Sequence, residues 1–144
     1  AFFYVSSSEW NLYNFIAHFA KLNDMPKAVL KLKDIKSGLG AYLVTGGGNH
    51  NHKFRKLKHL LEFYPKLTFI LLGDDSQKDP FIYEQIIKMF PASVKAVYIR
   101  STGRTQKTTV IEVLDNIQSL KVETCYFKNS ATAILHSQNI GLIS

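Results

Sequence analysis

The feature that most constrains the fold is a repeated alternation of short apolar runs with segments of helical periodicity. Each apolar run is bounded by turn residues and is followed by a stretch whose apolar residues recur every three or four positions. Leu67 to Leu72 is a continuous apolar run, as expected for a strand buried on both faces. Repeated strand–helix units predict a mainly parallel sheet with helices on both faces, a three-layer, Rossmann-like α/β fold.

The pattern gives bounds for each element. The expected strands are Phe2 to Val5, Ala28 to Leu32, Leu67 to Leu72, Val94 to Ile99 and Val122 to Phe127. The expected helices are Trp10 to Leu22, Lys53 to Tyr64, Phe81 to Phe90, Thr108 to Leu120 and Ala131 to Asn139. In the first expected helix, the apolar residues recur at helical spacing, at Leu12, Phe15, Ile16, Phe19 and Ala20. A length of 144 residues without a dividing linker predicts one domain, residues 1–144.

Composition excludes some functional classes and leaves others open. The apolar content of 46% is spread in short runs, which is typical of a soluble globular chain. The net charge of +7 would attract nucleic acid, anionic lipid or phosphorylated substrates, or it is simply a solvated surface. No lysine-rich tail or aromatic-interleaved basic patch favours nucleic acid, so none is expected as a partner. The single cysteine, Cys125, lies in an apolar run and is interpreted as a buried packing residue rather than a nucleophile.

Three carboxylates cluster at the end of one expected strand. Ligands of parallel α/β sheets bind beyond the carboxyl ends of the strands, and Asp74, Asp75 and Asp79 follow the run that ends at Leu72. Hard divalent cations such as Mg²⁺ prefer carboxylate oxygens. The alternative is structural, because Asp79 precedes Pro80 as a helix N-cap would and Asp74 would be a turn residue.

Two further positions could contact a phosphoryl group. Ser6, Ser7 and Ser8 follow the first expected strand, where hydroxyl and backbone N–H groups can hold phosphate oxygens. The alternative is an ordinary serine N-cap at Ser7 or Ser8. Lys53 opens a helix, where a cation opposes the helix dipole, so neutralising a phosphoryl group would explain it. A solvated surface lysine is the alternative.

Weaker candidates lie in loops. His50 and His52 could bind a metal, although alternate residues after a glycine-rich segment are more often mobile surface. Arg100 and Arg104, at a strand end, could contact a lipid phosphate or be solvated. The run Thr45-Gly46-Gly47-Gly48 is not a P-loop, because no Gly-Lys-Ser/Thr follows it.

The order of the three stronger features resembles that of a known enzyme family. A strand ending in Ser, a Lys opening a later helix and a strand ending in Gly-Asp-x-x-x-x-Asp occur in sequence, as in the haloacid dehalogenase-like phosphatases. Four segments narrow the match to one group within these phosphatases, namely Phe2 to Tyr13, Leu71 to Tyr83, Val97 to Arg100 and Gly141 to Ile143. The chain is similar to phosphatidate phosphatase catalytic domains of the actin-patch-protein type, over nearly its whole length.

The resemblance implies a role for each matched residue. Ser6 would hydrogen-bond the phosphoryl group, and Lys53 would offset its charge. Ser7, a candidate phosphate contact from its place after the strand, stands where the family usually has Asn. Asp74 would ligate or orient Mg²⁺, and Asp79 would support it. Asp75-Ser76 stand where the family usually has Ser-Gly, which is expected to add a charge beside the metal.

The superfamily's nucleophile is not found in the sequence. Its first motif is Asp-x-Asp, in which one aspartate attacks phosphorus and forms an aspartyl phosphate and the other protonates the leaving group. No Asp-x-Asp occurs here, and the chain starts at a strand without an initiator Met. We therefore expect an N-terminally incomplete domain that lacks the nucleophile strand, which in this family lies centrally, between the strands of Phe2 to Val5 and Leu67 to Leu72. The 144 residues alone are expected to be inactive.

Three functional hypotheses follow. The first is Mg²⁺-dependent hydrolysis of a phosphomonoester, with a phosphorylated lipid such as phosphatidate as substrate, in the cytoplasm with peripheral contact to anionic membranes. The second is a non-catalytic module that binds phosphate or anionic lipid. The third, less favoured, is a basic nucleic-acid-binding domain, for which binding would depend steeply on salt.

Overall fold

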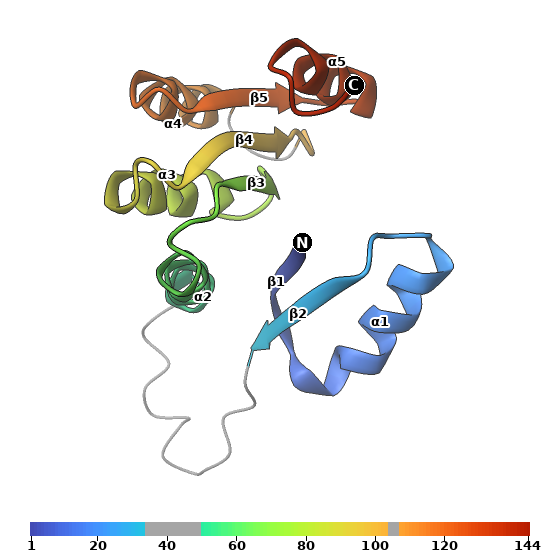
Figure 1. Cartoon of the computed structure of the whole chain (residues 1–144). Coiled ribbons are helices and arrows are strands. Elements are labelled where there is room, and N and C mark those ends of the chain that lie inside the picture. Colours follow the sequence, from blue (N-terminus) through green and yellow to red (C-terminus); the bar gives the residue numbers. More distant parts are fainter. Residues whose placement is uncertain (34–49, 104–106) are drawn as a thin grey trace. The chain divides into compact units, whose positions relative to one another are not determined.

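Two parallel sheets, each with its own helices, make up the described part of the chain (Figure 1). The computed structural model describes residues 1–33, 50–103 and 107–144. The chain divides into two compact units, Ala1–Leu60 and Leu61–Ser144. Parallel strands connected through helices confirm the expected α/β class.

The first unit is a β-α-β unit followed by the start of a further helix. Strand β1 (Phe2–Glu9) leads through a 3-10 turn (Trp10–Leu12) into α1 (Tyr13–Leu22) and then to β2 (Ala28–Lys33). β1 and β2 pair in parallel, with Phe2 opposite Ala28 and Val5 opposite Lys31. Helix α2 (His50–Phe63) is joined to this sheet by a hydrogen bond from the Lys56 ammonium to the carbonyl oxygen of Leu32.

The second unit contains a three-stranded parallel sheet in chain order. Its elements are β3 (Phe69–Asp74), α3 (Asp79–Met89), β4 (Val94–Arg100), α4 (Lys107–Ser119), β5 (Glu123–Phe127) and α5 (Ser130–Asn139). β4 lies between β3 and β5. The carboxyl ends of the strands are in register, with Asp74 opposite Arg100 and Arg100 opposite Phe127, so residues that follow the three strands emerge at one edge.

Successive residues of β4 point to opposite faces of this sheet, and both faces are packed. Ala96 and Tyr98 form a buried cluster with Cys125, against which residues of and after α5 pack. Val97 and Ile99, which are fully buried, point to the other face. Helices α3 and α4 pack against each other and against the strands. The sheet of the second unit is therefore the middle layer of three.

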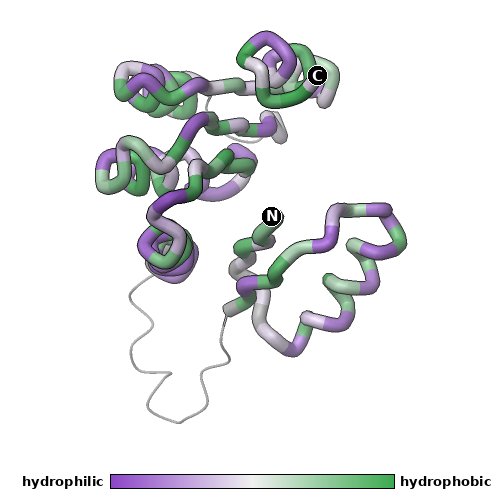
Figure 2. Tube along the Cα trace, viewed as in Figure 1, coloured by the Kyte–Doolittle hydropathy of each residue, from purple (hydrophilic) through white to green (hydrophobic). Residues whose placement is uncertain are grey.

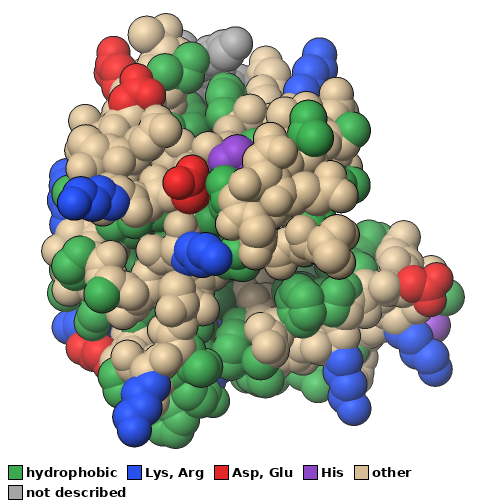
Figure 3. Space-filling view, turned by 45° about the horizontal axis from the view of Figure 1, so that its top comes forward, with side chains coloured by type: hydrophobic (Ala, Val, Ile, Leu, Met, Phe, Trp, Pro, Cys, Tyr) green, Lys and Arg blue, Asp and Glu red, His purple; other side chains and the backbone are tan. Residues whose placement is uncertain are grey.

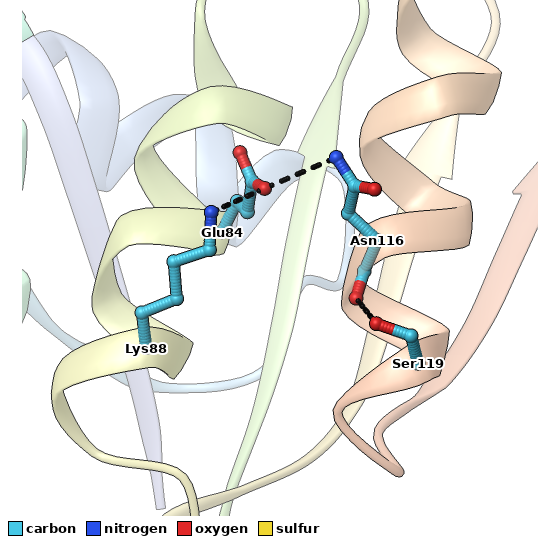
Figure 4. Close-up of polar contacts among 4 residues, drawn as sticks. All are labelled: Glu84, Lys88, Asn116 and Ser119. Atoms are coloured by element: carbon cyan, nitrogen blue, oxygen red, sulfur yellow. Dashed lines mark hydrogen bonds and ion pairs between the residues drawn. The ribbon is translucent and has the colours of Figure 1, made fainter.

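Helices α3 and α4 are also connected by polar side chains. One carboxylate oxygen of Glu84 lies 2.7 Å from the Lys88 ammonium and accepts a hydrogen bond of 3.3 Å from the Asn116 amide (Figure 4). The Ser119 hydroxyl donates to the backbone carbonyl of Asn116 at 2.6 Å. Exposed ion pairs contribute little stability, so apolar packing between the helices dominates.

The expectation that the strand of Leu67 to Leu72 is buried on both faces was wrong. β3 is buried on one face only, because Leu71 is buried whereas Ile70 is exposed and Leu72 is 64% exposed. The apolar positions of α1 do not all pack, since Phe15 is 70% exposed while Ile16 and Ala20 are partly buried. Figure 2 shows apolar and polar residues interspersed along this helix. Periodicity identified the helix but not which of its apolar residues are covered.

The expected central strand remains a prediction. Among the described strands, β1 pairs with β2 alone and β3 pairs with β4 alone. The glycine run of residues 46–48 and Arg104 fall outside the described residues, so the interpretations placed on them stay predictions as well.

Candidate functional site

The acidic segment at the end of β3 contains Asp74 and Asp79, the two carboxylates that the sequence indicated as candidates to hold a metal. Asp74 is the last residue of β3, and Asp79 is the first residue of α3, with Pro80 in its first turn. The N-cap alternative for Asp79 was wrong, because Lys78 occupies the cap position and no side chain caps this helix. Asp79 is only 4% exposed, so its carboxylate is directed into the molecule.

Gly73 allows the carboxylate of Asp79 to approach the strand. A Cβ atom at residue 73 would lie 2.7 Å from Asp79 Oδ2 and 2.9 Å from the Tyr83 hydroxyl. Both distances are too short for a real contact, so only glycine fits while these groups keep their places. The side chains of Asp79 and Tyr83, four residues apart on α3, therefore lie directly against the end of β3.

Tyr83 is a residue of this site to which no role was assigned from the sequence. Its hydroxyl donates a hydrogen bond of 2.6 Å to the backbone carbonyl of Leu72. Burial raises the pKa of Tyr83, and the negative charges of Asp79 and then Asp74 raise it further, so the hydroxyl stays protonated. Both carboxylates thus lie close enough to raise the pKa of the same hydroxyl. The sequence signal was the spacing of an aromatic residue one helical turn after Asp79.

Asp74 is held by the turn that follows it. Its Oδ1 atom accepts hydrogen bonds from the Ser76 backbone N–H at 2.8 Å and from the Ser76 hydroxyl at 2.5 Å. This is the arrangement by which an aspartate side chain stabilises a turn two residues ahead. The turn-residue interpretation of Asp74 is thereby confirmed, and it is compatible with a metal role because a carboxylate has several lone pairs.

The donor chemistry suits a magnesium ion held in part by this chain. Within residues 1–33, 50–103 and 107–144, no three His, Cys, Asp or Glu side chains converge as a complete metal site. Mg²⁺ usually keeps several waters and takes one or two carboxylates together with substrate phosphate oxygens. Asp74 and Asp79 fit such a partial set, and Asp74 would hold the ion with Asp79 in support.

Ser6 lies inside a strand rather than after one. β1 continues to Glu9, and its register with β2 shifts between Val5 and Glu9. The Ser6 hydroxyl accepts a hydrogen bond of 3.0 Å from the Ser8 backbone N–H. The serine-cap alternative was wrong, because Leu12 is the N-cap residue of α1 and makes no side-chain cap. Ser7 belongs to the same irregular strand segment.

Lys53 lies in the first turn of α2, as the sequence indicated, although the helix begins three residues earlier at His50. His50 and His52 are therefore helical, and their assignment to a mobile loop was wrong. Their context after the glycine-rich segment concealed the helix start.

The structure thus groups Asp74 and Asp79 around Tyr83 in the second unit, and it holds Ser6 and Lys53 in the first unit. Arg100 is exposed at the end of β4, with its backbone carbonyl accepting from the Asp75 N–H at 3.1 Å.

Comparison with known protein families matches residues 1–101 to the family described as "Phosphatidate phosphatase APP1, catalytic domain". The chain belongs to this family. The match extends from β1 to the end of β4 and includes each of Ser6, Lys53, Asp74 and Asp79.

A curated relative agrees with the family assignment. The chain is 29% identical over 99 residues to phosphatidate phosphatase APP1 of Saccharomyces cerevisiae. The aligned region covers 69% of this chain but 16% of the yeast protein, so the chain corresponds to a small part of that relative. No solved structure matches the chain.

The expectation that Asp75 adds a charge beside a metal stays a prediction, but the structure gives its carboxylate partners within the protein. It is only 1% exposed, and it accepts hydrogen bonds from Thr102 and Tyr126. Burial alone would raise the pKa of Asp75, but hydrogen bonds from Thr102, Tyr126 and Ser101 outweigh it and hold the pKa below its usual value. Asp75 is therefore an ionised, internally bonded group.

Membrane crossing and thiol chemistry receive no support from the described residues. In those parts of the chain, no helix is both long and apolar enough to cross a bilayer. Cys125 is a buried free cysteine, and burial raises the pKa of its thiol. Its interpretation as a packing residue is confirmed by its place in the cluster with Ala96 and Tyr98.

Proposed function

We propose that this chain is part of a Mg²⁺-dependent phosphatidate phosphatase, a hydrolase of lipid metabolism that forms an aspartyl phosphate. Membership of the catalytic-domain family supports the reaction class. The observation that carries the proposal is the meeting of Asp74, Asp79 and Tyr83 at the carboxyl end of β3. Ligands of such sheets bind at that end.

Each proposed site residue has a distinct task in this reaction. Ser6 and Ser7 hydrogen-bond the non-bridging phosphate oxygens, and the Lys53 ammonium offsets part of the phosphate charge. Asp74, supported by Asp79, would hold Mg²⁺, and a bound Mg²⁺ would neutralise negative charge on the phosphoryl group. Tyr83, protonated and hydrogen-bonded to the carbonyl of Leu72, lies beside Asp79 at the strand end.

The attacking group is proposed to be an aspartate outside these residues, since none of the 144 positions provides an Asp-x-Asp motif. That aspartate forms a bond to phosphorus while the bond between phosphorus and the diacylglycerol oxygen breaks. The second aspartate of the motif donates a proton to the departing oxygen. Water then releases inorganic phosphate and restores the carboxylate.

The proposed setting is the cytoplasm, with peripheral contact to an anionic membrane where the lipid substrate resides. The net charge of +7 favours such a surface. On the face shown in Figure 3, Lys and Arg side chains are dispersed rather than gathered in one patch. Dispersed cations fit general attraction to a charged bilayer, whereas a nucleic-acid backbone is usually bound by a continuous basic stripe.

The test is phosphate release from phosphatidate in phosphatidylcholine vesicles by the full-length gene product. Asp74→Asn is expected to lower kcat about 100-fold or more, because a metal-holding carboxylate is lost. Asp115→Asn, an exposed aspartate on α4, is the matched control and should retain activity. Equal activity of Asp74→Asn and the wild type would rule out the proposed role of the β3 end.

A second function, binding without turnover, is favoured by the missing Asp-x-Asp. The 144-residue chain would then hold phosphate or anionic lipid as a module. Vesicle sedimentation of this chain, alongside activity of the full-length gene product, separates the two. Binding by the short chain with no hydrolysis by the full-length product would establish the module, whereas hydrolysis by the full-length product would establish the enzyme.

A further inference from the structure

Asp75 occupies a buried position where all three strands of the second sheet end. Its Oδ1 atom accepts hydrogen bonds from the Thr102 backbone N–H at 2.7 Å and from the Thr102 hydroxyl at 2.5 Å. Its Oδ2 atom accepts from the Tyr126 hydroxyl at 2.6 Å. Thr102 follows β4 and Tyr126 belongs to β5, so one side chain connects the ends of β3, β4 and β5.

The direction of this carboxylate separates it from its neighbour in sequence. Asp74 hydrogen-bonds forward to Ser76, whereas Asp75 hydrogen-bonds across the sheet to Thr102 and Tyr126. Both oxygens of Asp75 are already engaged by donors within the protein. Two adjacent aspartates could have been two ligands of one ion, but the structure gives them different partners.

The backbone at this residue is fixed as well. The Asp75 N–H donates to the carbonyl oxygen of Arg100 at 3.1 Å, and the Ser101 N–H donates to the carbonyl oxygen of Phe127 at 2.7 Å. A buried carboxylate is stable only while its donors, here Thr102 and Tyr126, remain in place. The side chain and backbone of Asp75 therefore define the conformation at the start of the turn, residues 75–78, that separates Asp74 from Asp79.

We propose that Asp75 is a positioning residue that clamps the carboxyl end of β3 to the loop after β4 and to β5, and so holds Asp74 in place beside Asp79. Groups that orient a metal ligand without touching the metal commonly change metal affinity or activity about 10- to 100-fold when they are removed. The clamp itself stands on the geometry, while its effect on Mg²⁺ rests on the proposed function.

Two measurements test the clamp separately from the reaction. In the 144-residue chain, Asp75→Ala is expected to speed amide hydrogen exchange at Thr102 and Ser76, while exchange in α4 is unchanged. In the full-length gene product, Asp75→Ala should raise the Mg²⁺ concentration for half-maximal phosphatidate hydrolysis about 10- to 100-fold over the wild type. Asp75→Asn keeps the side-chain volume and one acceptor oxygen, so both effects should be smaller in this variant than in Asp75→Ala. Tyr126→Phe should also change both in the same direction as Asp75→Ala, but less.

The outcomes distinguish the alternatives. If exchange at Thr102 quickens but the Mg²⁺ requirement of all three variants stays that of the wild type, the residue is structural and the positioning role is wrong. If Thr102 exchange is unchanged in Asp75→Asn and Asp75→Ala, the clamp itself is wrong. Absence of hydrolysis in the wild type would overturn the proposed function, while the exchange result would still decide the clamp. Asp115→Asn serves as the control in both assays.

Discussion

At the scale of single residues, the close packing of Gly73, Asp79 and Tyr83 determines the arrangement at the end of β3, in addition to their charges. Gly73 leaves the space into which Asp79 and Tyr83 fit, and Tyr83 bonds the strand through the carbonyl of Leu72. Burial, and then the charges of two nearby carboxylates, raise the pKa of this hydroxyl, so it keeps its proton. One closely packed unit at the end of β3 is therefore made up of Gly73, Asp79 and Tyr83.

Gly73→Ala should disrupt this unit. The added Cβ would overlap Asp79 Oδ2, so the free energy of unfolding should fall by about 1–3 kcal/mol, as for an overpacked core. The Mg²⁺ requirement of the full-length gene product should rise at the same time. Urea unfolding and Mg²⁺ titration measure the two effects.

Gly141→Ala provides the comparison for that variant. Its positive φ of 67° makes alanine unfavourable by about 1–2 kcal/mol, yet no atom lies within 4 Å of the new Cβ. It should lose stability without a change in Mg²⁺ requirement. A Gly73→Ala protein that behaved like Gly141→Ala would contradict the close approach of Asp79.

Cys125 should react slowly with thiol reagents while the protein is folded. Burial raises the pKa of its thiol, so less thiolate is present at neutral pH, and the side chain is covered by the packing against α5. Labelling with an aromatic disulfide reagent at pH 7 should be slow, and it should reach the rate of an unstructured cysteine peptide in urea. Rapid labelling of the folded chain would contradict the packing assigned to β5.

At the scale of elements, every expected strand and helix is present, and the differences concern ends and faces. The strand of Phe2 to Val5 continues to Glu9, because the backbone of the serines extends alongside β2 despite their low strand propensity. Helix α2 begins at His50, inside a segment that looked like loop. Local pattern gives the type of an element, whereas its ends depend on pairing with distant residues.

Helix α5 is held on the sheet by polar contacts as well as apolar ones. The Tyr98 hydroxyl lies 2.7 Å from the Ser137 hydroxyl and 3.0 Å from His136 Nδ1, with the two rings edge to face. Tyr98→Phe should therefore lower the free energy of unfolding by about 1 kcal/mol and speed amide exchange in α5. Urea unfolding and hydrogen exchange measure these changes, and unchanged α5 exchange would mean that apolar packing alone holds the helix.

At the scale of the whole molecule, the places of the candidate residues could be predicted in part. Lys53 lies at a helix start, and Asp74 and Asp79 lie around the end of β3, as the strand–helix order indicated, whereas Ser6 lies inside β1. The roles of these residues in binding phosphate and metal stay predictions. The contacts of Asp75 could not be predicted, because its partner Tyr126 is 51 residues away in the chain. Such contacts exist only once the strands are side by side, so sequence spacing does not reveal them.

The most direct test of the central claim is Mg²⁺-dependent release of inorganic phosphate from phosphatidate vesicles by the full-length gene product. The proposed function predicts that EDTA abolishes release, that added Mg²⁺ restores it, and that Asp74→Asn lowers it about 100-fold while Asp115→Asn does not. Hydrolysis that is indifferent to EDTA, or to the loss of the Asp74 carboxylate, would contradict a magnesium site at the end of β3.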